Sequence, residues 1–241
     1  MKISIVVPAF NEEAGLGAAL SSIRNAMRAF DRRGWSSELI VCDNNSTDAT
    51  ATVAREAGAT VVFEPVNQIG RARNAGAARA TGEWLIFVDA DSHPSAALFD
   101  DVAAAIERGR CLAGGSTIVY DNPHLVVRTI VRAWNTLSRL NRWAAGSFIF
   151  CEAAVFREVG GFSLEFFAGE EIDLSRRLKR AAGRRGRTIA ILHEHPLLTS
   201  DRKLRLYTAR EIATFMVRTA ITPRRTLGNP RQCYAWYDGR R

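Results

Sequence analysis

The first ninety or so residues alternate between short apolar runs and helical segments, and no other feature of the sequence limits the fold as strongly. Runs typical of buried strands occupy 3–7, 38–42, 60–64 and 84–88. The segments between them show helical apolar spacing or are rich in alanine. Strands that alternate with helices in this way predict an α/β fold with a mostly parallel sheet flanked by helices.

The second half of the chain is less regular. Strand-like runs and helical patterns follow one another at 95–108, 112–120, 125–143, 147–151, 170–182 and 188–192. Ser95 is the expected N-cap of the first of these helices. The tail from residue 201 is again helical and basic. With 241 residues, the chain suits one sizeable α/β domain with a helical C-terminal extension.

Composition and charge exclude few classes of protein. No apolar run approaches the ~20 residues that cross a bilayer, and the start of the chain shows no signal-peptide pattern. Four cysteines are scattered without a CxxC pair, so we expect core or near-surface thiols of a reducing compartment rather than disulfides or a zinc site. The net charge of +8 is compatible with binding to nucleic acid, to an anionic membrane or to phosphorylated substrates, and equally with a generally basic proteome. It therefore does not distinguish between these functions.

Polar side chains follow three of the predicted strands. Asn11 and Glu12 come after the first strand, the segment 43–45 after the second, and Asp89 and Asp91 after the fourth. In parallel sheets, ligands bind outside the carboxyl ends of the strands. The sequence therefore predicts a ligand site at this edge of the sheet.

The common nucleotide-binding loops are missing from this edge. The pattern GxxxxGK[ST] is absent, and PAFNEE stands where a dinucleotide fingerprint would follow the first strand. A P-loop protein and a Rossmann dehydrogenase are therefore disfavoured. What remains is a nucleotide that is bound through acids at the strand ends and through a metal ion.

The two acids after the fourth strand are separated by one alanine. Such carboxylates are costly to desolvate unless a positive group lies beside them, and that group is either a basic side chain or a metal ion. A hard divalent cation such as Mg²⁺ or Mn²⁺ takes oxygen ligands from acids and from a diphosphate at the same time. We therefore expect Asp89 and Asp91 to hold a divalent cation that is shared with a nucleoside diphosphate.

Four stretches, in order, resemble glycosyltransferase family 2, the large GT-A-fold group of nucleotide-sugar-dependent transferases. They are VVPAFNEE, the Asp of VCDNNSTDAT, GRARNAGAARATGEWLIFVDADSHP and VFREVGGFSLEFFAGEEIDLSRRL. The resemblance covers about 3–195. It implies a Rossmann-like catalytic domain over 1–198, with a nucleotide-binding half (1–92) and an acceptor-side half (93–198), followed by a basic helical extension (199–241). It also implies a UDP- or GDP-sugar donor and transfer with inversion.

The family pattern, carried over residue by residue, implies a donor site at the strand ends. Its members are Pro8, Ala9, Phe10, Glu12, Asp43, Asn45, Arg71, Asn74, Asp89, Ala90 and Asp91. Within this set Asp43 would read the base, Asp89 would contact the ribose or the metal, and Asp91 would be the principal metal ligand. Arg73 lies close to this set in sequence.

The segment GEEID resembles the Gly-Glu-Asp motif of the family, whose Asp is the general base of inverting members. Glu171 holds that position here and is the first candidate base, with Glu170 second and Asp173 third. On a helix, residues 170 and 173 share a face, whereas 171 points elsewhere. The base would deprotonate the acceptor hydroxyl that attacks the anomeric carbon.

Two later segments have alternative interpretations. His193 either completes the metal shell, as a late histidine does in several relatives of this fold, or is a structural residue; it is better placed for the metal than His195, and His93 is expected to be a loop residue. The segment 199–205 either brings Arg202 or Lys203 over the diphosphate in a closing loop or begins a solvated basic helix.

The basic amphipathic segments 125–143 and 203–221 either dock on an anionic membrane, near a lipid-linked acceptor, or pack on the domain with a solvated arginine face.

Expected partners are a nucleotide-sugar donor and a glycan, lipid-linked or small-molecule acceptor, without nucleic acid. The expected location is the cytoplasm or the inner face of the cell membrane. Two alternatives are a nucleotide-sugar-forming nucleotidyltransferase, whose Gly-rich loop is missing, and a non-catalytic sugar-nucleotide-binding protein, against which Asp89, Asp91 and Glu171 argue.

Overall fold

The computed structural model describes residues 1–121, 125–144, 146–201, 211, 214, 218–219 and 221–233. Its strands are β1 (Lys2–Ala9), β2 (Ser36–Asp43), β3 (Thr60–Phe63), β4 (Trp84–Val88), β5 (Ser92–His93), β6 (Cys111–Tyr120), β7 (Phe148–Glu152) and β8 (Thr188–Thr199). Its helices are α1 (Leu16–Asp31), α2 (Thr50–Glu56), α3 (Ile69–Arg79), α4 (Ala96–Glu107), α5 (Leu125–Asn141), α6 (Ala153–Glu158), α7 (Glu170–Arg184) and α10 (Pro223–Leu227). Across these residues, the strands form one eight-stranded sheet in the order β3-β2-β1-β4-β7-β6-β8-β5.

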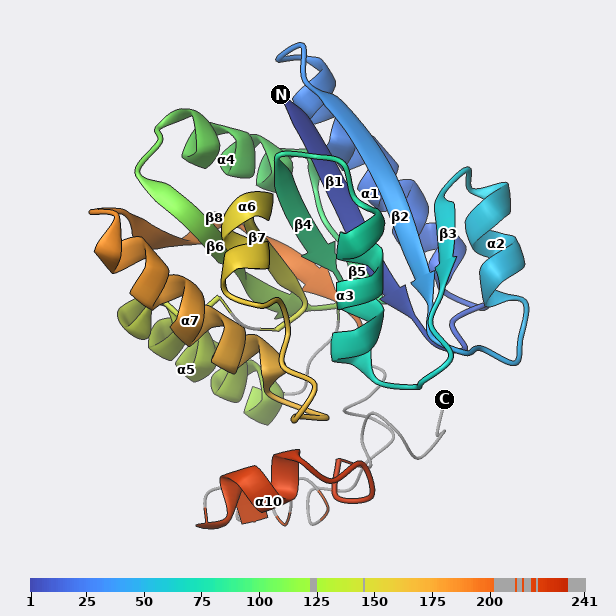
Figure 1. Cartoon of the computed structure of the whole chain (residues 1–241), viewed down its shortest axis with the longest axis vertical. Coiled ribbons are helices and arrows are strands. Elements are labelled where there is room, and N and C mark those ends of the chain that lie inside the picture. Colours follow the sequence, from blue (N-terminus) through green and yellow to red (C-terminus); the bar gives the residue numbers. More distant parts are fainter. Residues whose placement is uncertain are drawn as a thin grey trace.

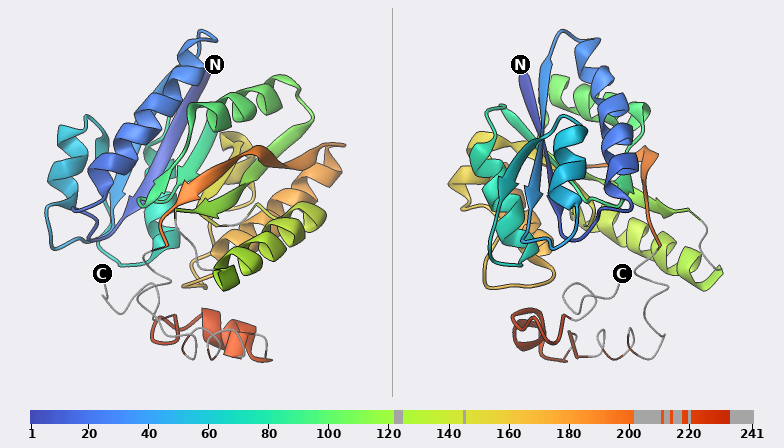
Figure 2. Two further views of the ribbon diagram at one scale, coloured as in Figure 1. Left: turned by 180° about the vertical axis from the view of Figure 1, so that it is seen from behind. Right: turned by 90° about the vertical axis from the view of Figure 1, so that its right-hand side faces the viewer.

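Helices cover both faces of the sheet, because successive residues of its central strands point to opposite sides. Ile5 and Val7 of β1 belong to a core cluster shared with α1 and α4, whereas Val6 belongs to a second cluster shared with α3, α6 and α7. Figure 1 shows α3, α6 and α7 in front of the sheet, and the right-hand view of Figure 2 shows the sheet between two helical layers. The fold is therefore a three-layered α/β arrangement.

The half of the sheet from β3 to β4 is parallel, as the alternation of strands and helices predicts. β1 pairs with β2 up to Ala9↔Asp43, but with β4 only up to Val6↔Phe87. Pro8 therefore lies where β1 has a neighbour on one side only, a position that tolerates a residue without an N–H. For this reason the strand continues beyond the run 3–7 instead of ending at the proline.

The other half of the sheet is mixed, because β7 enters between β4 and β6 in the reverse direction. β7 is antiparallel to both neighbours, and Val88 of β4 is the register partner of Phe148. β6 and β8 are parallel, and β5 is antiparallel to β8. The irregular pattern after residue 92 thus corresponds to a departure from the βαβ order.

Glycine allows α3 to lie directly on β1 and β2. A Cβ atom built on Gly76 would be 2.4 Å from Cγ1 of Val6 and 3.8 Å from Cβ of Cys42. By contrast, a Cβ atom on Gly183 of α7 would have no neighbour within 4 Å. The close approach at Gly76 brings the N-terminal half of α3 to the carboxyl edge of the sheet.

Other local predictions are confirmed in part; His93, which was expected in a loop, instead lies in β5 and pairs with Leu198 of β8. The Ser95 side chain caps α4 by accepting a hydrogen bond of 3.1 Å from the backbone N–H of Leu98. All four cysteines are buried and free. β8 is longer than the predicted run 188–192, so His193 lies inside the strand rather than after it.

The C-terminal extension is described in part. Arg202 and Lys203 lie outside the described residues, as does most of 203–221, whereas α10 and the residues up to Cys233 are described. No helix in the described ranges combines the length and the apolar character that crossing a bilayer requires.

Candidate active site

The carboxyl edge of the sheet holds a buried bridge of two ion pairs centred on Arg73. Its guanidinium donates through Nη2 to Oδ1 of Asp89 and through Nη1 to Oε1 of Glu170, each at 2.8 Å. The side chains of Arg73 and Glu170 are 3% and 2% exposed, and that of Asp89 is 20% exposed. The guanidinium carbon also lies 5.1 Å from the ring centroid of Phe162. Asp89 therefore has a basic side chain of α3 as a positive partner, whereas the sequence predicted a divalent cation in that role.

The cluster holds one positive group, Arg73, and three acids, Asp89, Glu170 and Glu171. Burial disfavours the excess negative charge. Burial raises the pKa of Glu170 well above its ordinary value, the charge of Glu171 raises it further, and Arg73 opposes both effects only in part. Burial by itself would lower the pKa of Arg73, but Asp89, Glu170 and Glu171 outweigh it and raise that pKa. Arg73 therefore stays charged, and a proton on Glu170 relieves its repulsion with Glu171.

The N-terminal half of α3 also holds the loop that leads to α7. Gln68 donates through Nε2 to two backbone carbonyls of this loop, at 3.0 and 2.9 Å. Asn74 exchanges two hydrogen bonds of 2.9 Å with the backbone of Phe162. A Cβ atom on Gly70 would lie 3.2 Å from another carbonyl of the loop. These contacts fix Glu170 relative to the end of β4.

Two residues of this helix were expected near the donor. Asn74 uses both polar side-chain atoms to hold Phe162, so the structure directs it toward the loop before α7. Arg71 is half-buried and donates through Nε to Oε1 of Gln68 at 3.1 Å, which keeps it beside the strand ends.

The three acids at the start of α7 have different partners. Glu170 accepts from Arg73, and Asp173 accepts from Nε of Arg177 at 2.8 Å. Oε2 of Glu171 is buried and, like Oε2 of Glu170, has no hydrogen-bond partner within the described part of the chain. Among the three acids, Glu171 is the one that forms no ion pair with a described arginine.

The residues expected around the nucleoside gather where β1 and β2 end. Ala9 and Asp43 are register partners, Pro8 precedes them, and Phe10 and Glu12 follow in the turn toward α1. Asp43 is 7% exposed and accepts a hydrogen bond of 3.0 Å from the backbone N–H three residues later. The structure therefore brings these five residues together at one edge.

Asparagines shape the turns at the same edge. Asn11 and Asn45 adopt positive φ angles of 51° and 65°, a left-handed conformation that asparagine tolerates better than most residues. Oδ1 of Asn11 accepts from the backbone N–H of Thr47 at 2.8 Å, which ties the two turns together. Asn44, which belongs to the polar segment predicted after the second strand, accepts from the backbone N–H of Gln68 at 2.9 Å and links these turns to α3.

Asp91 lies beside the ends of β5 and β8. Its backbone carbonyl accepts from the N–H of Ser200 at 3.1 Å. Ser92 is the register partner of Thr199, and Thr199 is also the register partner of Tyr120 in β6. The end of β6 therefore belongs to the same edge as the two acids.

The acids of this edge also act on the Tyr120 phenol. Burial raises the pKa of Tyr120, and the charges of Asp91, Asp201 and Asp89 raise it further. Among the described residues, no group of three or more His, Cys, Asp or Glu side chains could hold a metal ion. Mg²⁺ is commonly bound by one or two carboxylates together with substrate phosphates. Asp91 with Asp89 therefore fits a cation shared with a diphosphate, and not one enclosed by protein ligands.

The structure does not bring His193 to these acids. His193 is exposed and follows the residue of β8 that pairs with Ser116 of β6. Ser116 lies roughly 13 Å along β6 from Tyr120, at about 3.3 Å per residue. His195, which the sequence ranked lower, pairs with Asp101 at 2.9 Å.

The described end of the C-terminal extension lies on the side of α7. The N–H of Phe167, in the loop before α7, donates to the carbonyl of Leu227 in α10 at 2.6 Å. Cys233 is buried; burial raises the pKa of its thiol to about 12, with a contribution from the charge of Glu170. Figure 1 shows α10 beyond the carboxyl ends of the parallel strands. The sequence predicted a basic helical extension but not its contact with the loop before α7.

A family model described as glycosyl transferase family 2 matches residues 4–160. An uncharacterized glycosyltransferase of Mycobacterium tuberculosis is 35% identical over 141 residues, which are 57% of this chain and 60% of the relative. The chain therefore spans about three fifths of the length of that relative. A dolichol-phosphate mannosyltransferase of Pyrococcus furiosus is 29% identical over 127 residues, which are 49% of this chain and 34% of the relative.

Solved structures share the fold at low sequence identity. A mannosyltransferase from Pyrobaculum calidifontis, in complex with GDP-Man and Mn²⁺, has a TM-score of 0.68 at 20% identity, covering 97% of this chain and 68% of the other. Residues 1–349 of TarS from S. aureus give a TM-score of 0.67 at 18% identity, covering 98% of this chain and 68% of the other. This structural similarity confirms the predicted GT-A fold. The sheet is mixed, whereas the sequence predicted a mostly parallel one.

Proposed function

Because the chain belongs to glycosyltransferase family 2, we propose that it transfers a sugar from a UDP- or GDP-sugar to an acceptor hydroxyl, with Mg²⁺ or Mn²⁺ and with inversion. A nucleotide-sugar donor is supported by the solved neighbours, since TarS is known in complex with UDP-GlcNAc and the Pyrobaculum enzyme with GDP-Man and Mn²⁺. The nucleoside would contact the turns after β1 and β2, and the diphosphate would lie toward Asp91 and Arg71.

The observation that carries this proposal is the Arg73 bridge. Its two 2.8 Å ion pairs join Asp89, at the end of β4 on the expected donor side, to Glu170, at the start of α7 beside the expected base. Group transfer requires the donor and the base to be held in a fixed relation, because misplacement by about 1 Å can cost about 10²-fold in rate. A buried bridge between two secondary-structure elements supplies that rigidity.

Glu171 is the proposed base. Glu170 is held by Arg73 and Asp173 by Arg177, whereas Glu171 forms no ion pair with a described arginine. As the acceptor oxygen bonds to the anomeric carbon, Glu171 takes its proton. The bond between that carbon and the diphosphate oxygen breaks, and the nucleoside diphosphate leaves with the electron pair. When bound, the divalent cation held by Asp91 and Asp89 would offset the charge of that leaving group.

The acceptor is proposed to be lipid-linked or a cell-envelope glycan that the protein meets at the inner face of the membrane. α5 supports this proposal, because it exposes large apolar side chains next to arginines. Those side chains are Leu125 at 69%, Ile130 at 59%, Leu137 at 44% and Leu140 at 78% exposed. At 100° per residue they fall within one side of the helix.

The first test measures the binding of nucleoside diphosphates and nucleotide sugars by thermal shift, with and without Mn²⁺. We expect a UDP or GDP compound to raise the Tm only in the presence of metal. Asp91→Ala should abolish that shift, while Asp100→Ala, which removes an acid of the surface helix α4, should keep it. A set of compounds that leaves the Tm unchanged in every case would contradict the transferase proposal.

The second test concerns the base. Glu171→Gln should keep donor binding and lose transfer by about 10²- to 10⁴-fold, the usual contribution of general base catalysis. Glu165→Gln changes the same charge at an exposed position in the preceding loop and should transfer sugar at the wild-type rate. If Glu171→Gln retains transfer, the base is another carboxylate.

A further inference from the structure

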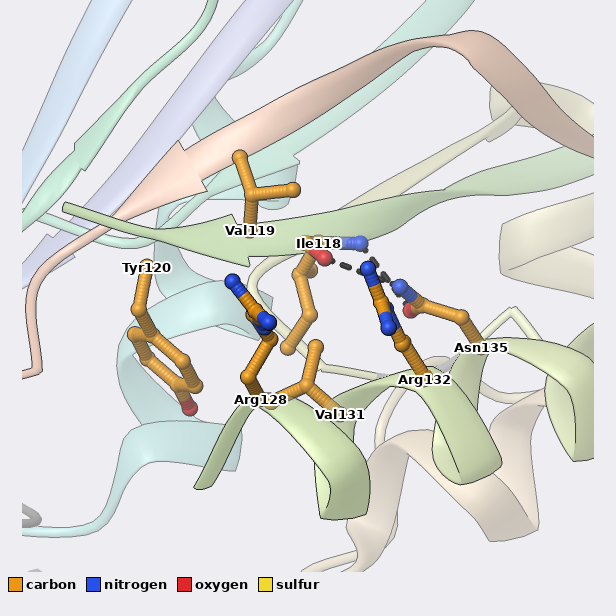
Figure 3. Close-up of a pocket in the computed structure, with 7 residues that line it drawn as sticks. All are labelled: Ile118, Val119, Tyr120, Arg128, Val131, Arg132 and Asn135. Atoms are coloured by element: carbon orange, nitrogen blue, oxygen red, sulfur yellow. Dashed lines mark hydrogen bonds between the residues drawn. The ribbon is translucent and has the colours of Figure 1, made fainter. Parts of the chain in front are cut away.

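A cavity of about 280 Å³ lies between α5 and the end of β6, apart from the Arg73 bridge. It is lined by Ile118, Val119, Tyr120, Arg128, Val131, Arg132 and Asn135. Figure 3 shows both arginine side chains extending from α5 toward β6, with Tyr120 beside Arg128. The volume is roughly nine times the ~30 Å³ share of one water molecule in the liquid. It can therefore hold a small oxyanion and part of the group to which that oxyanion is attached.

Asn135 fixes α5 against the edge of β6. The N–H of Ile118 donates to Oδ1 of Asn135 at 3.1 Å, and Nδ2 of Asn135 donates to the carbonyl of Ile118 at 2.9 Å. The pairing of β6 with β7 stops at Gly115. The Asn135 side chain therefore bonds the backbone of Ile118 in the place of a neighbouring strand. Arg128 and Arg132 precede Asn135 by two turns and one turn of helix and share its face. The two hydrogen bonds of Asn135 therefore hold both arginines over the end of β6.

The two arginines of the cavity form no ion pair with a described residue. Both are exposed, and within the described ranges neither guanidinium takes part in an ion pair. By contrast, Arg33 pairs with Asp100 and Arg177 pairs with Asp173. Like charges one helical turn apart repel each other, so an anion between them would be stabilised.

The cavity adjoins the edge that carries the two acids after β4. Tyr120 pairs with Thr199, and Thr199 pairs with Ser92, the residue after Asp91. Two strand spacings, roughly 10 Å, therefore separate Tyr120 from Ser92. The raised pKa of Tyr120 keeps its phenol protonated, so that it can donate a hydrogen bond at neutral pH.

We propose that this cavity binds a phosphate group carried by the acceptor, and thereby places the acceptor hydroxyl toward the donor. Two guanidinium groups match a phosphate in charge and in fork geometry, and the Tyr120 hydroxyl adds a third donor. Ile118 and Val131 would contact the apolar part of the acceptor next to the phosphate. This inference rests on the proposed function and narrows its acceptor to phosphate-bearing molecules.

The same phosphate chemistry occurs in a soluble phosphate ester and in a lipid-linked acceptor, for whose lipid phosphate the hydroxyl-free farnesyl phosphate serves only as a binding probe. The test therefore uses three probes: glycerol phosphate, farnesyl phosphate and uncharged farnesol. Binding of each to the full-length protein is measured by titration calorimetry. We expect at least one phosphate-bearing probe to bind, and farnesol to bind more weakly than farnesyl phosphate. Affinity for farnesyl phosphate alone identifies a lipid source, and affinity for glycerol phosphate identifies a soluble one.

Two double variants distinguish phosphate binding in the cavity from a general effect of the positive net charge. Arg128→Gln/Arg132→Gln should lower the affinity for the phosphate-bearing probe by about tenfold or more, since both charge-assisted donors to the phosphate are lost. Arg139→Gln/Arg142→Gln removes one exposed arginine from the other end of α5 and one from the residue that follows the helix, and should change that affinity less than about twofold. Equal losses in both variants, or no binding of any phosphate-bearing probe, would overturn the proposal.

Binding of UDP and GDP with Mn²⁺ is measured on the same proteins and should be unchanged by either double variant. A parallel loss in the cavity variant would assign Arg128 and Arg132 to the donor diphosphate and refute the acceptor assignment. If the wild-type protein binds no nucleoside diphosphate but binds phosphate through these arginines, the anion site stands and the transferase proposal fails.

Discussion

Replacing Arg73 by methionine is the most informative single perturbation of this structure. Methionine keeps part of the length and the apolar contact with Phe162 but removes the charge and both donors. Asp89 and Glu170 then lose their 2.8 Å partners, and Glu170, at 2% exposure, loses the one positive group that lowers its pKa and is left as a buried acid without that partner. Removal of one partner of a buried pair is costly because the remaining group either keeps an uncompensated charge or takes up a proton and stays buried without its hydrogen bond.

The expected cost follows from the two contacts. Hydrogen bonds to charged groups contribute about 1.5–3 kcal/mol each, and removal of one partner of a buried pair typically costs about 3–5 kcal/mol. Because Asp89 is 20% exposed and regains some water, we expect a loss near the lower end, about 3–4 kcal/mol. That is a large share of the ~5–15 kcal/mol that stabilises a folded protein.

The assay is equilibrium unfolding in urea, followed by far-ultraviolet circular dichroism. The matched control is Arg32→Met, which breaks an ion pair of 2.6 Å with Asp100, but between side chains that are 55% and 35% exposed. Exposed pairs contribute about 0–1 kcal/mol, so the control should unfold close to wild type. Adding Glu170→Gln to Arg73→Met should recover part of the loss. Equal destabilisation by Arg73→Met and Arg32→Met would refute the reasoning from burial.

Two further predictions concern stability. The pKa of Glu170 is raised above its ordinary 4.5 on folding, so this group favours the folded state below that pH, and its contribution is lost as the pH rises through the folded pKa. Glu170→Gln mimics the protonated acid, so its stability relative to wild type should increase from pH 4 to pH 8 in urea titrations; a constant difference would contradict the raised pKa. Gly76→Ala should cost about 1–3 kcal/mol, because its Cβ atom would lie 2.4 Å from Val6, whereas Gly183→Ala in open space should gain about 0.5–1 kcal/mol. Thermal unfolding of the two alanine variants measures this contrast, and shifts of the same sign would contradict the packing at Gly76.

The parts of the fold that the sequence predicted depend on local patterns. The alternation of strands and helices gave the parallel half of the sheet, and the cap at Ser95 needs only the three residues after it. The antiparallel entry of β7 has no such signal, because it depends on pairing between Val88 and Phe148, which are far apart in sequence. Pairing between distant segments is decided by tertiary packing rather than by the pattern of either segment.

The candidate site also has parts that the sequence predicted and parts that it did not. The acids at the strand ends could be predicted, because parallel strands bring their carboxyl ends to one edge. The role of Arg73 could not, since a fully buried arginine is rare and its two partners come from different elements. A signal was present, however: Arg73 shares a helix face with Gly70 and Ala77, small residues that mark close packing. The distance of His193 from Asp91 depends on the register of β8, which the sequence does not encode locally.

The reversed entry of β7 also has a consequence for the chain as it is being made. The backbone N–H of Asp89 donates to the carbonyl of Ser147, just before β7, at 3.1 Å. At about 5–20 residues per second, the ribosome needs several seconds after β4 to complete β7. During that interval the apolar strand β4 has an open edge, which is a site for pairing with other chains. The pairing of β7 with β4 closes that edge, and the residue just before β7 binds the backbone of Asp89, so the same segment protects the strand from aggregation and holds an acid of the site.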